Sequence, residues 1–171
     1  FSLKYPEVRL EVSTEDRAVD MIEEGFDLVI RVNPSPDENL VGRIFLRDRL
    51  VVVASPGLTR PVANEAALAV VRSAGDRQTW EVKTPDGVEK IAVEPVLALS
   101  SMIMVRDAVR AGVGAGRLPI SLVSHDLADG TLAHWGDIDG PEIALWTLYP
   151  SRRLLSARVA AFLDYLKQAF P

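Results

Sequence analysis

The segment FDLVIRV, residues 26–32, decides the fold, because it is almost continuously apolar. Such a run is typical of a strand that is covered on both faces, as strands of parallel sheets are. Gly25 precedes it in a position that ends a helix, and apolar and polar residues alternate over residues 8–12, as in a half-exposed edge strand. Residues 7–32 are therefore predicted to form a β-α-β unit with parallel strands, the start of an α/β domain.

A helix is predicted between these two strands. Ser13 or Thr14 supplies its N-cap, and Ala18, Val19 and Ile22 form its apolar face.

The remainder of the chain predicts further strands and helices without an internal repeat. Strands are expected at residues 44–46, 50–54, 95–99 and 143–149, and a hairpin at residues 80–83 and 88–93. Helices are expected at residues 102–112 and 120–127, at the alanine-rich segment 64–71, and at the end of the chain through Val159, Phe162, Leu163 and Leu166.

Composition excludes several classes of protein. The 171 residues are 48% hydrophobic and carry a net charge of -5, which argues against a nucleic-acid contact by these residues. The chain contains no cysteine, and hence no disulfide framework and no thiolate metal site. Its apolar runs, such as residues 50–54, are far shorter than the roughly 20 residues needed to cross a bilayer, so no membrane contact is predicted.

No catalytic residue, metal site or cofactor site is predicted. The two histidines, His125 and His134, lack a nearby metal-ligand spacing, and no nucleophile elbow occurs. Gly112, Gly114 and Gly116 resemble a dinucleotide fingerprint, but Arg117 stands where the third glycine belongs and the run follows a helix. These glycines are interpreted as residues that allow a helix to pack tightly on a strand.

Polar residues at strand ends and helix starts favour binding of a small organic anion. They are Ser13-Thr14, Arg31-Val32-Asn33 and Ser100-Ser101. A helix N-terminus offers backbone N–H groups and partial positive charge, and a guanidinium holds a carboxylate through two parallel hydrogen bonds. The alternative, in which the serines only cap their helices and Arg31 pairs with a nearby acid, is left open by the residues taken singly.

Several motifs together carry a resemblance to a known family. In chain order they are YPEVRLEV, DRAVDMIEEGFDLVIRV, NLVGRIFLRDRLVVVASP, AVRAGVGAGRLP, LADGTLAHW and LWTLYPSRRLLSARVAAFLDYL. In their order and spacing, over essentially the whole chain, they resemble the effector-binding domain of LysR-type transcriptional regulators.

The resemblance implies a periplasmic-binding-protein-like (type II) α/β fold with two lobes and two crossover segments. The outward crossover is expected near residues 70–75 and the return near 146–149, so that lobe I takes residues 1–71, lobe II 72–146, and residues 147–171 return to lobe I. The chain begins at Phe1 without Met or a leader pattern, so a longer protein is expected. The family's first strand and its basic N-terminal helix-turn-helix domain would lie upstream.

The resemblance also implies a site and partners. Its effector-binding residues correspond to Arg31, Val32, Asn33, Ser100, Ser101, Met102 and Thr147, in a cleft between the lobes. Arg117 departs from the family, which commonly has an aliphatic pair at Ala115-Gly116 and an apolar strand after it. The effector would be a small molecule, expected to be a carboxylate, that favours one arrangement of the lobes.

The implied protein is a cytoplasmic, bacterial homodimer or tetramer that pairs through residues 8–12 and the adjacent helix, and it contacts DNA only through the helix-turn-helix domain. It is not an enzyme. The alternative is a solute-binding protein of a transport system, which shares the fold and would carry a signal peptide upstream. An enzyme that uses the same cleft is disfavoured, because the sequence shows no convincing nucleophile or acid/base pair.

Overall fold

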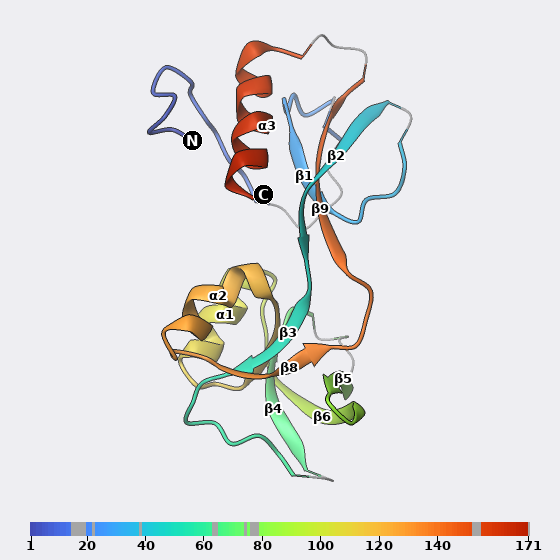
Figure 1. Cartoon of the computed structure of the whole chain (residues 1–171), viewed down its shortest axis with the longest axis vertical. Coiled ribbons are helices and arrows are strands. Elements are labelled where there is room, and N and C mark those ends of the chain that lie inside the picture. Colours follow the sequence, from blue (N-terminus) through green and yellow to red (C-terminus); the bar gives the residue numbers. More distant parts are fainter. Residues whose placement is uncertain are drawn as a thin grey trace. The chain divides into compact units, whose positions relative to one another are not determined.

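The computed structural model of the chain describes residues 1–14, 20–21, 23–37, 39–62, 65–73, 75, 79–151 and 155–170. Its strands are β1 (Val29–Val32), β2 (Leu40–Asp48), β3 (Leu50–Ala54), β4 (Ala66–Val71), β5 (Thr79–Thr84), β6 (Gly87–Ala98), β7 (Ala115–Pro119), β8 (Ala133–Ile138) and β9 (Ile143–Pro150). Its helices are α1 (Met102–Arg110), α2 (Ile120–Ala128) and α3 (Ala157–Ala169) (Figure 1).

The chain divides into two compact units. Unit 1 comprises Phe1–Arg47 and Ile143–Pro171, and unit 2 comprises Asp48–Glu142. The first boundary differs from the one expected near residues 70–75, because β3 and β4 are both strands of the sheet in unit 2. The crossover that the resemblance implied near residues 70–75 therefore lies two strands too late along the chain. The second boundary lies a few residues before the expected return at residues 146–149.

In the described residues of unit 1, a three-stranded sheet in the order β1-β9-β2 is accompanied by helix α3. Strand β1 pairs antiparallel with β9, and Val29 lies opposite Leu148. Helix α3 contributes Leu163 to a buried cluster with Met21 and Tyr149. Ser156 caps this helix through a hydrogen bond from the backbone N–H of Val159 to its hydroxyl oxygen, 3.4 Å apart. The strand and final helix predicted for the end of the chain are both present.

The predicted parallel β-α-β unit does not form in the part of unit 1 that the structure describes. Residues 8–12 are not a strand, and Leu10 and Val12 are exposed. Alternation alone is insufficient, because a strand also needs a neighbour to satisfy its N–H and C=O groups. Strand β1 is present, although it begins only at Val29 and its neighbour β9 is antiparallel. The predicted helix face of Ala18, Val19 and Ile22 lies outside the described residues.

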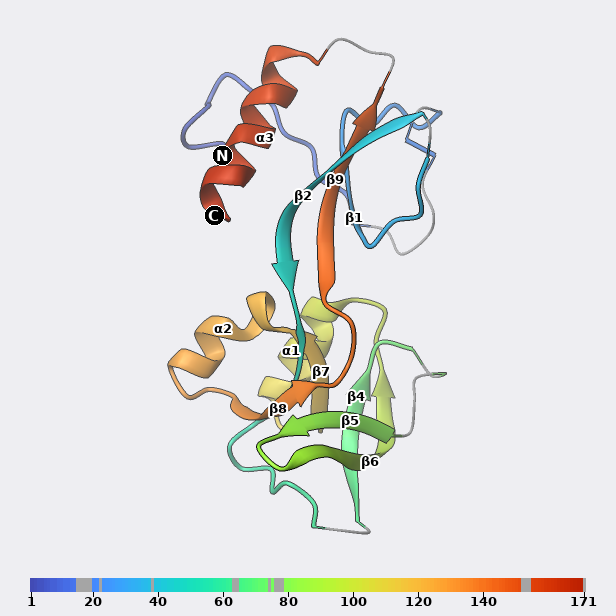
Figure 2. The same cartoon turned by 45° about the vertical axis from the view of Figure 1, so that its right-hand side comes forward.

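Unit 2 is a closed barrel in the strand order β3-β7-β4-β6-β5-β8. The predicted hairpin is confirmed as β5 and β6, and β4 runs parallel to both β6 and β7 (Figure 2). Val52 and Ala54 of β3 belong to the core inside the barrel, whereas Val51 and Val53 belong to a second cluster under α1 and α2. Strand β3 is continuously apolar because both of its faces are covered.

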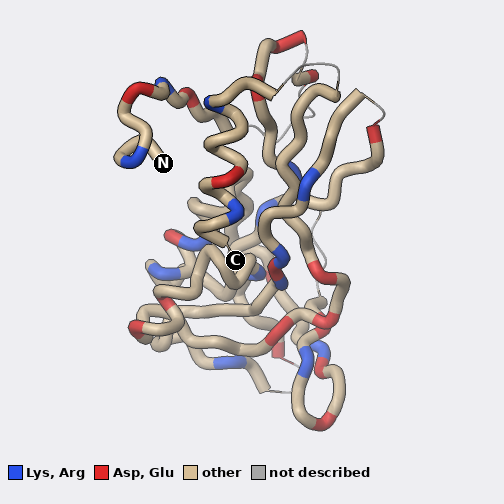
Figure 3. The backbone as a smooth tube through the Cα atoms, turned by 45° about the horizontal axis from the view of Figure 1, so that its top comes forward, with Lys and Arg blue, Asp and Glu red and all other residues tan. Residues whose placement is uncertain are grey.

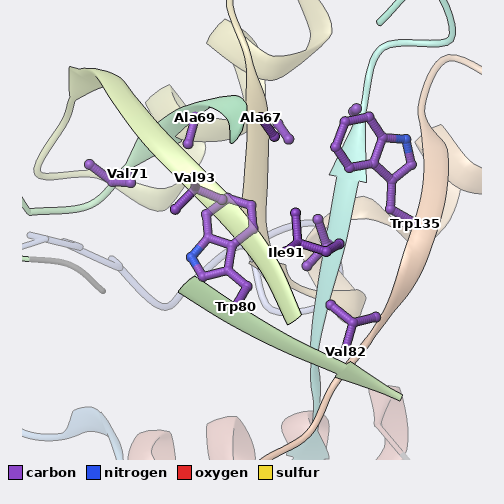
Figure 4. Close-up of a cluster of buried hydrophobic side chains, with 11 residues drawn as sticks. Ala67, Ala69, Val71, Trp80, Val82, Ile91, Val93 and Trp135 are labelled. Atoms are coloured by element: carbon purple, nitrogen blue, oxygen red, sulfur yellow. The ribbon is translucent and has the colours of Figure 1, made fainter. Parts of the chain in front are cut away.

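The alanine-rich segment forms a strand, so the predicted helix at residues 64–71 is wrong. Ala67, Ala69 and Val71 alternate into the barrel core, where Trp80 and Trp135 already fill much of the space (Figure 4). Small side chains fit beside two indole rings, and the pairing of β4 with two neighbours outweighs the helical propensity of alanine.

Gly116, in β7, brings α1 close to the barrel, as the sequence predicts. A Cβ on Gly116 would lie 2.7 Å from Cγ2 of Val109 in α1. Gly114, just before β7, allows a close approach to β4, because a Cβ there would lie 2.7 Å from the carbonyl oxygen of Leu68.

Candidate functional site

In unit 1 the structure brings four predicted site residues together on β1 and β9. Arg31 lies opposite Trp146, Val32 opposite Leu145, and Ile30 opposite Thr147. Asn33 follows β1 with a positive φ of 42°, and its side-chain oxygen accepts a 2.9 Å hydrogen bond from the N–H of Ala144. Its own N–H donates to the carbonyl of Ala144 at 3.0 Å. The side chain of Asn33 thus joins the end of β1 to the start of β9.

Thr147 also has a structural task. It is 1% exposed, and its hydroxyl donates a 3.2 Å hydrogen bond to the carbonyl of Arg43 on β2. Asn33 and Thr147 therefore hold the three strands together, whereas Arg31 is half-buried and Val32 is exposed. Of the four, Arg31 and Val32 are the side chains better placed to meet a ligand.

In unit 2 the predicted residues Ser100, Ser101 and Met102 stand at the start of α1. Ser101 occupies the N-cap position with an extended backbone, but its hydroxyl makes no capping hydrogen bond, and the first turn contains no acidic residue. The interpretation of Ser101 as only a cap therefore finds no support. The N-terminus of this helix keeps its partial positive charge without a carboxylate beside it.

Met102 lines a cavity of about 210 Å³ in unit 2, which we call the arginine cavity. Its other lining residues come from the end of β4, from β5 and from β7: Val70, Val71, Arg72, Trp80 and Arg117. Parallel strands β4, β6 and β7 direct their carboxyl ends toward this region, and Leu99 after β6 donates a 2.9 Å hydrogen bond to the carbonyl of Val71. Ligands of α/β proteins gather at such strand ends.

The arginine cavity suits a small anion with an apolar part. Arg72 and Arg117 place two guanidinium groups on its lining, and Trp80 and Met102 supply apolar surface. Arg72 and Trp80 were not predicted as site residues, and Arg117 was predicted only as a departure from the family. No sequence signal marked Arg72, because the segment before it was predicted to be a helix and forms strand β4 only in the folded barrel.

A metal centre finds no support in the described part of the chain, where no three His, Asp or Glu side chains are grouped as ligands. His125 lies on α2, and His134 lies on β8 with its Nε2 2.9 Å from Oδ1 of Asp137. Among the helices described, none has the length and apolar character to span a bilayer.

Comparison with known proteins gives a consistent result over the whole chain. The family model described as the LysR substrate binding domain matches residues 1–171. The chain is 26% identical to the probable HTH-type transcriptional regulator LtrA of Klebsiella pneumoniae, covering 100% of this chain and 59% of that protein. It is 29% identical to the HTH-type transcriptional regulator YhjC of Escherichia coli K12, covering 97% of this chain and 59% of the relative.

Among solved structures, the regulatory domain of CrgA from Neisseria meningitidis, described as a LysR-type transcriptional regulator, superposes with a TM-score of 0.81. That likeness covers 99% of this chain and 88% of the CrgA domain at 24% identity, so it concerns the fold.

Proposed function

The chain belongs to the LysR substrate binding domain family, and from this membership we propose that it is the part of a LysR-type transcriptional regulator that senses a small-molecule effector. The fold is the α/β, periplasmic-binding-protein-like (type II) fold of such domains, with two units. Because the chain spans 59% of the length of the first curated relatives, DNA binding is proposed for an N-terminal helix-turn-helix domain outside these residues.

The observation that carries the proposal is the arginine cavity. Arg72 and Arg117 line it beside Met102, the first residue of α1. A guanidinium pairs with a carboxylate through two parallel charge-assisted hydrogen bonds, which are stronger than hydrogen bonds between neutral groups. We therefore propose an organic carboxylate as effector, with the arginines on its charged group and Trp80 and Met102 against its apolar part.

The other predicted site residues stay proposals. Ser100 and Ser101 offer hydroxyl groups and the N-terminus of α1, and Arg31 and Val32 offer a cation and an apolar surface in unit 1. Asn33 and Thr147 are proposed to act indirectly, because their side chains already bond to the backbone.

Effector binding would act by population shift. A ligand that binds one conformation more tightly than another shifts the equilibrium by its difference in affinity, and that shift would reach the DNA-binding domains of a dimer or tetramer. We propose a cytoplasmic regulator without catalytic activity, since the curated relatives are named as transcriptional regulators. The same names disfavour the alternative of a solute-binding protein.

Thermal shift and calorimetry with benzoate, succinate and their neutral amides test this function. A ligand at roughly a hundred times its Kd adds about 2.7 kcal/mol of stability, which raises Tm measurably. An acid should stabilise the chain and its amide should not, and Arg72→Gln or Arg117→Gln should weaken binding about tenfold or more. Lys90→Gln is the matched control, because Lys90 lies on β6 and pairs with Glu81 outside the cavity.

Equal stabilisation by acid and amide would contradict an anionic effector. Unchanged affinity in both arginine variants would remove the arginine cavity from the site. Ser101→Leu adds a separate check, because a bulky side chain at the start of α1 should block a ligand there while the fold is kept.

A further inference from the structure

Unit 2 contains a second cavity, of about 400 Å³, which we call the hairpin cavity. It is lined by Arg60, Lys83, Thr84, Pro85, His134, Trp135, Gly136 and Asp137. These residues come from the segment after β3, from β5 and the turn that follows it, and from β8. None of them lines the arginine cavity, and the hairpin cavity is the shallower of the two and more open to solvent.

One side of this cavity is lined by residues 134–137 of β8, where the pairing of β8 with β3 is irregular. The pairing register with β3 shifts, so that Val52 lies opposite Gly136 but Val53 lies opposite His134. Trp135 is thus an extra residue, the mark of a β-bulge, and its 7% exposed ring belongs to the barrel core (Figure 4). Bulges redirect side chains and are enriched beside functional sites.

Gly136 makes this arrangement possible. Its φ of +143° is one that L side chains rarely adopt, and a Cβ there would collide with Cγ1 of Val82. A backbone in such a conformation has a higher free energy than ordinary strand geometry, and residues of this kind are concentrated at functional sites. The bulge sets His134 at the surface, where 44% of its side chain is exposed, directly beside the buried Trp135.

Two cations, Arg60 and Lys83, and one acid, Asp137, line the hairpin cavity together with the imidazole of His134, although the whole chain carries a charge of -5. Both oxygens of Asp137 are engaged, since Oδ1 contacts Nε2 of His134 at 2.9 Å and Oδ2 accepts a 3.0 Å hydrogen bond from Nε of Arg49. Asp137 therefore orients the imidazole of His134 and the guanidinium of Arg49.

Two further acids pair with the lining cations from outside the cavity. Glu89 lies 2.8 Å from Arg60, and Asp139 lies 3.5 Å from Lys83. Acidic and basic residues follow one another along the sequence of the β5–β6 hairpin, and Figure 3 marks the positions of such residues on the backbone in red and blue. All four of these side chains are at least 35% exposed, and such surface pairs contribute only about 0–1 kcal/mol each. A ligand with a higher local charge can therefore compete with these carboxylates for Arg60 and Lys83.

We propose that the hairpin cavity binds the phosphate group of a small ligand. A phosphate dianion presents several oxygens with a charge near -2, which suits donors that converge from three separate segments better than the single charge of a carboxylate does. Arg60, Lys83 and His134 supply those donors, and the apolar floor at Trp135 and Pro85 leaves room for the body of a phosphate monoester. This site is separate from the proposed effector site.

The test is calorimetric titration of the 171-residue chain with inorganic phosphate and with phenyl phosphate, using acetate and chloride at matched ionic strength as comparators. Phosphate should bind and both comparators should not. Arg60→Gln and Lys83→Gln should each weaken binding roughly threefold, and the double variant about tenfold. Lys90→Gln, on the same hairpin but outside the cavity, should leave the affinity unchanged. Circular dichroism and Tm confirm that each variant folds.

The remaining outcomes overturn the proposal. Equal weakening by Lys90→Gln would reduce the effect to general attraction of anions. Weakening by Arg117→Gln but not by Arg60→Gln or Lys83→Gln would place the phosphate in the arginine cavity. Absence of binding up to roughly 10 mM phosphate, or equal binding of acetate, would remove the site. One outcome instead supports the proposal and identifies the ligand: tighter binding of phenyl phosphate than of inorganic phosphate would indicate a phosphate monoester and not the free ion.

Discussion

Gly116→Ala should destabilise unit 2 by forcing α1 away from β7. The new Cβ would lie 2.7 Å from Cγ2 of Val109 and 3.5 Å from Cγ1 of Val105, and both valines are buried in the cluster under α1. Two carbon atoms prefer a separation of about 3.5–4.0 Å, so the Val109 methyl would have to retreat by about 1 Å. A helical valine has essentially one χ1 rotamer, so rotation offers no escape.

The expected cost is about 1–3 kcal/mol in the free energy of unfolding, the usual range for an overpacked core. Val109→Ala alone should cost about 2–3 kcal/mol, from two lost methyl groups and a cavity. In the double variant the colliding methyl is absent, so the combined loss should fall short of the sum by at least about 1 kcal/mol. Urea unfolding, followed by the fluorescence of the buried Trp80 and Trp135, measures each value.

Gly140→Ala is the matched control, because a Cβ there would meet only Cγ2 of Ile138 at an ordinary 3.6 Å. It should change stability by less than about 0.5 kcal/mol. If Gly116→Ala behaves like this control, or if the double variant is additive within about 0.5 kcal/mol, then the close approach of α1 to β7 is not what requires glycine.

Two further substitutions test polar contacts of unit 2. Asp48→Asn should lower the free energy of unfolding, measured in urea, by about 1–3 kcal/mol. The reason is that Asp48 is only 5% exposed and its carboxylate accepts hydrogen bonds from the N–H of Arg49, at 2.7 Å, and from the hydroxyl of Ser121 at the start of α2. An unchanged urea midpoint would refute this. The pKa of Asp129 is lowered, first by a hydrogen bond from the side chain of Thr131 and second by one from its backbone N–H. The charged carboxylate of Asp129 therefore stabilises the folded state at neutral pH. This stabilisation is lost as the pH falls through the lowered pKa. Thr131→Val should move the pKa of Asp129 back up toward its ordinary value in a carboxyl NMR titration, and an unmoved pKa would exclude the hydroxyl as the cause.

Local patterns predicted unit 2 better than unit 1. The hairpin, α1 and α2 follow from turn residues and helical spacing, because their hydrogen bonds join residues close in sequence. Strand β3 follows from its continuous apolar run, although the strands that pair with it, β7 and β8, are distant in sequence. Segment 64–71 shows the opposite case: its alanines favour a helix, but two strands distant in sequence pair with it. Residues 8–12 show the reverse error, since no strand in the described part of the chain pairs with their strand-like alternation.

The candidate site was predicted in part for the same reason. Strand ends and helix starts mark Arg31 and Ser101 from the sequence alone, and the resemblance to the family adds Met102. Met102, Trp80 and Arg117 line one cavity only because the barrel closes and brings together strands that are separated by dozens of residues in the sequence. The hairpin cavity depends in addition on a bulge, and a bulge is a property of two paired strands.

The amino-acid sequence by itself determined the family, the α/β class, the acidic charge and most of the helices, because these depend on composition and on patterns within short segments. The tertiary structure alone decided where unit 1 ends, that Ala66–Val71 is a strand, and which cations converge on a cavity. Those features depend on contacts between residues far apart in the chain, and folding brings such residues together only when burial and strand pairing outweigh local preference.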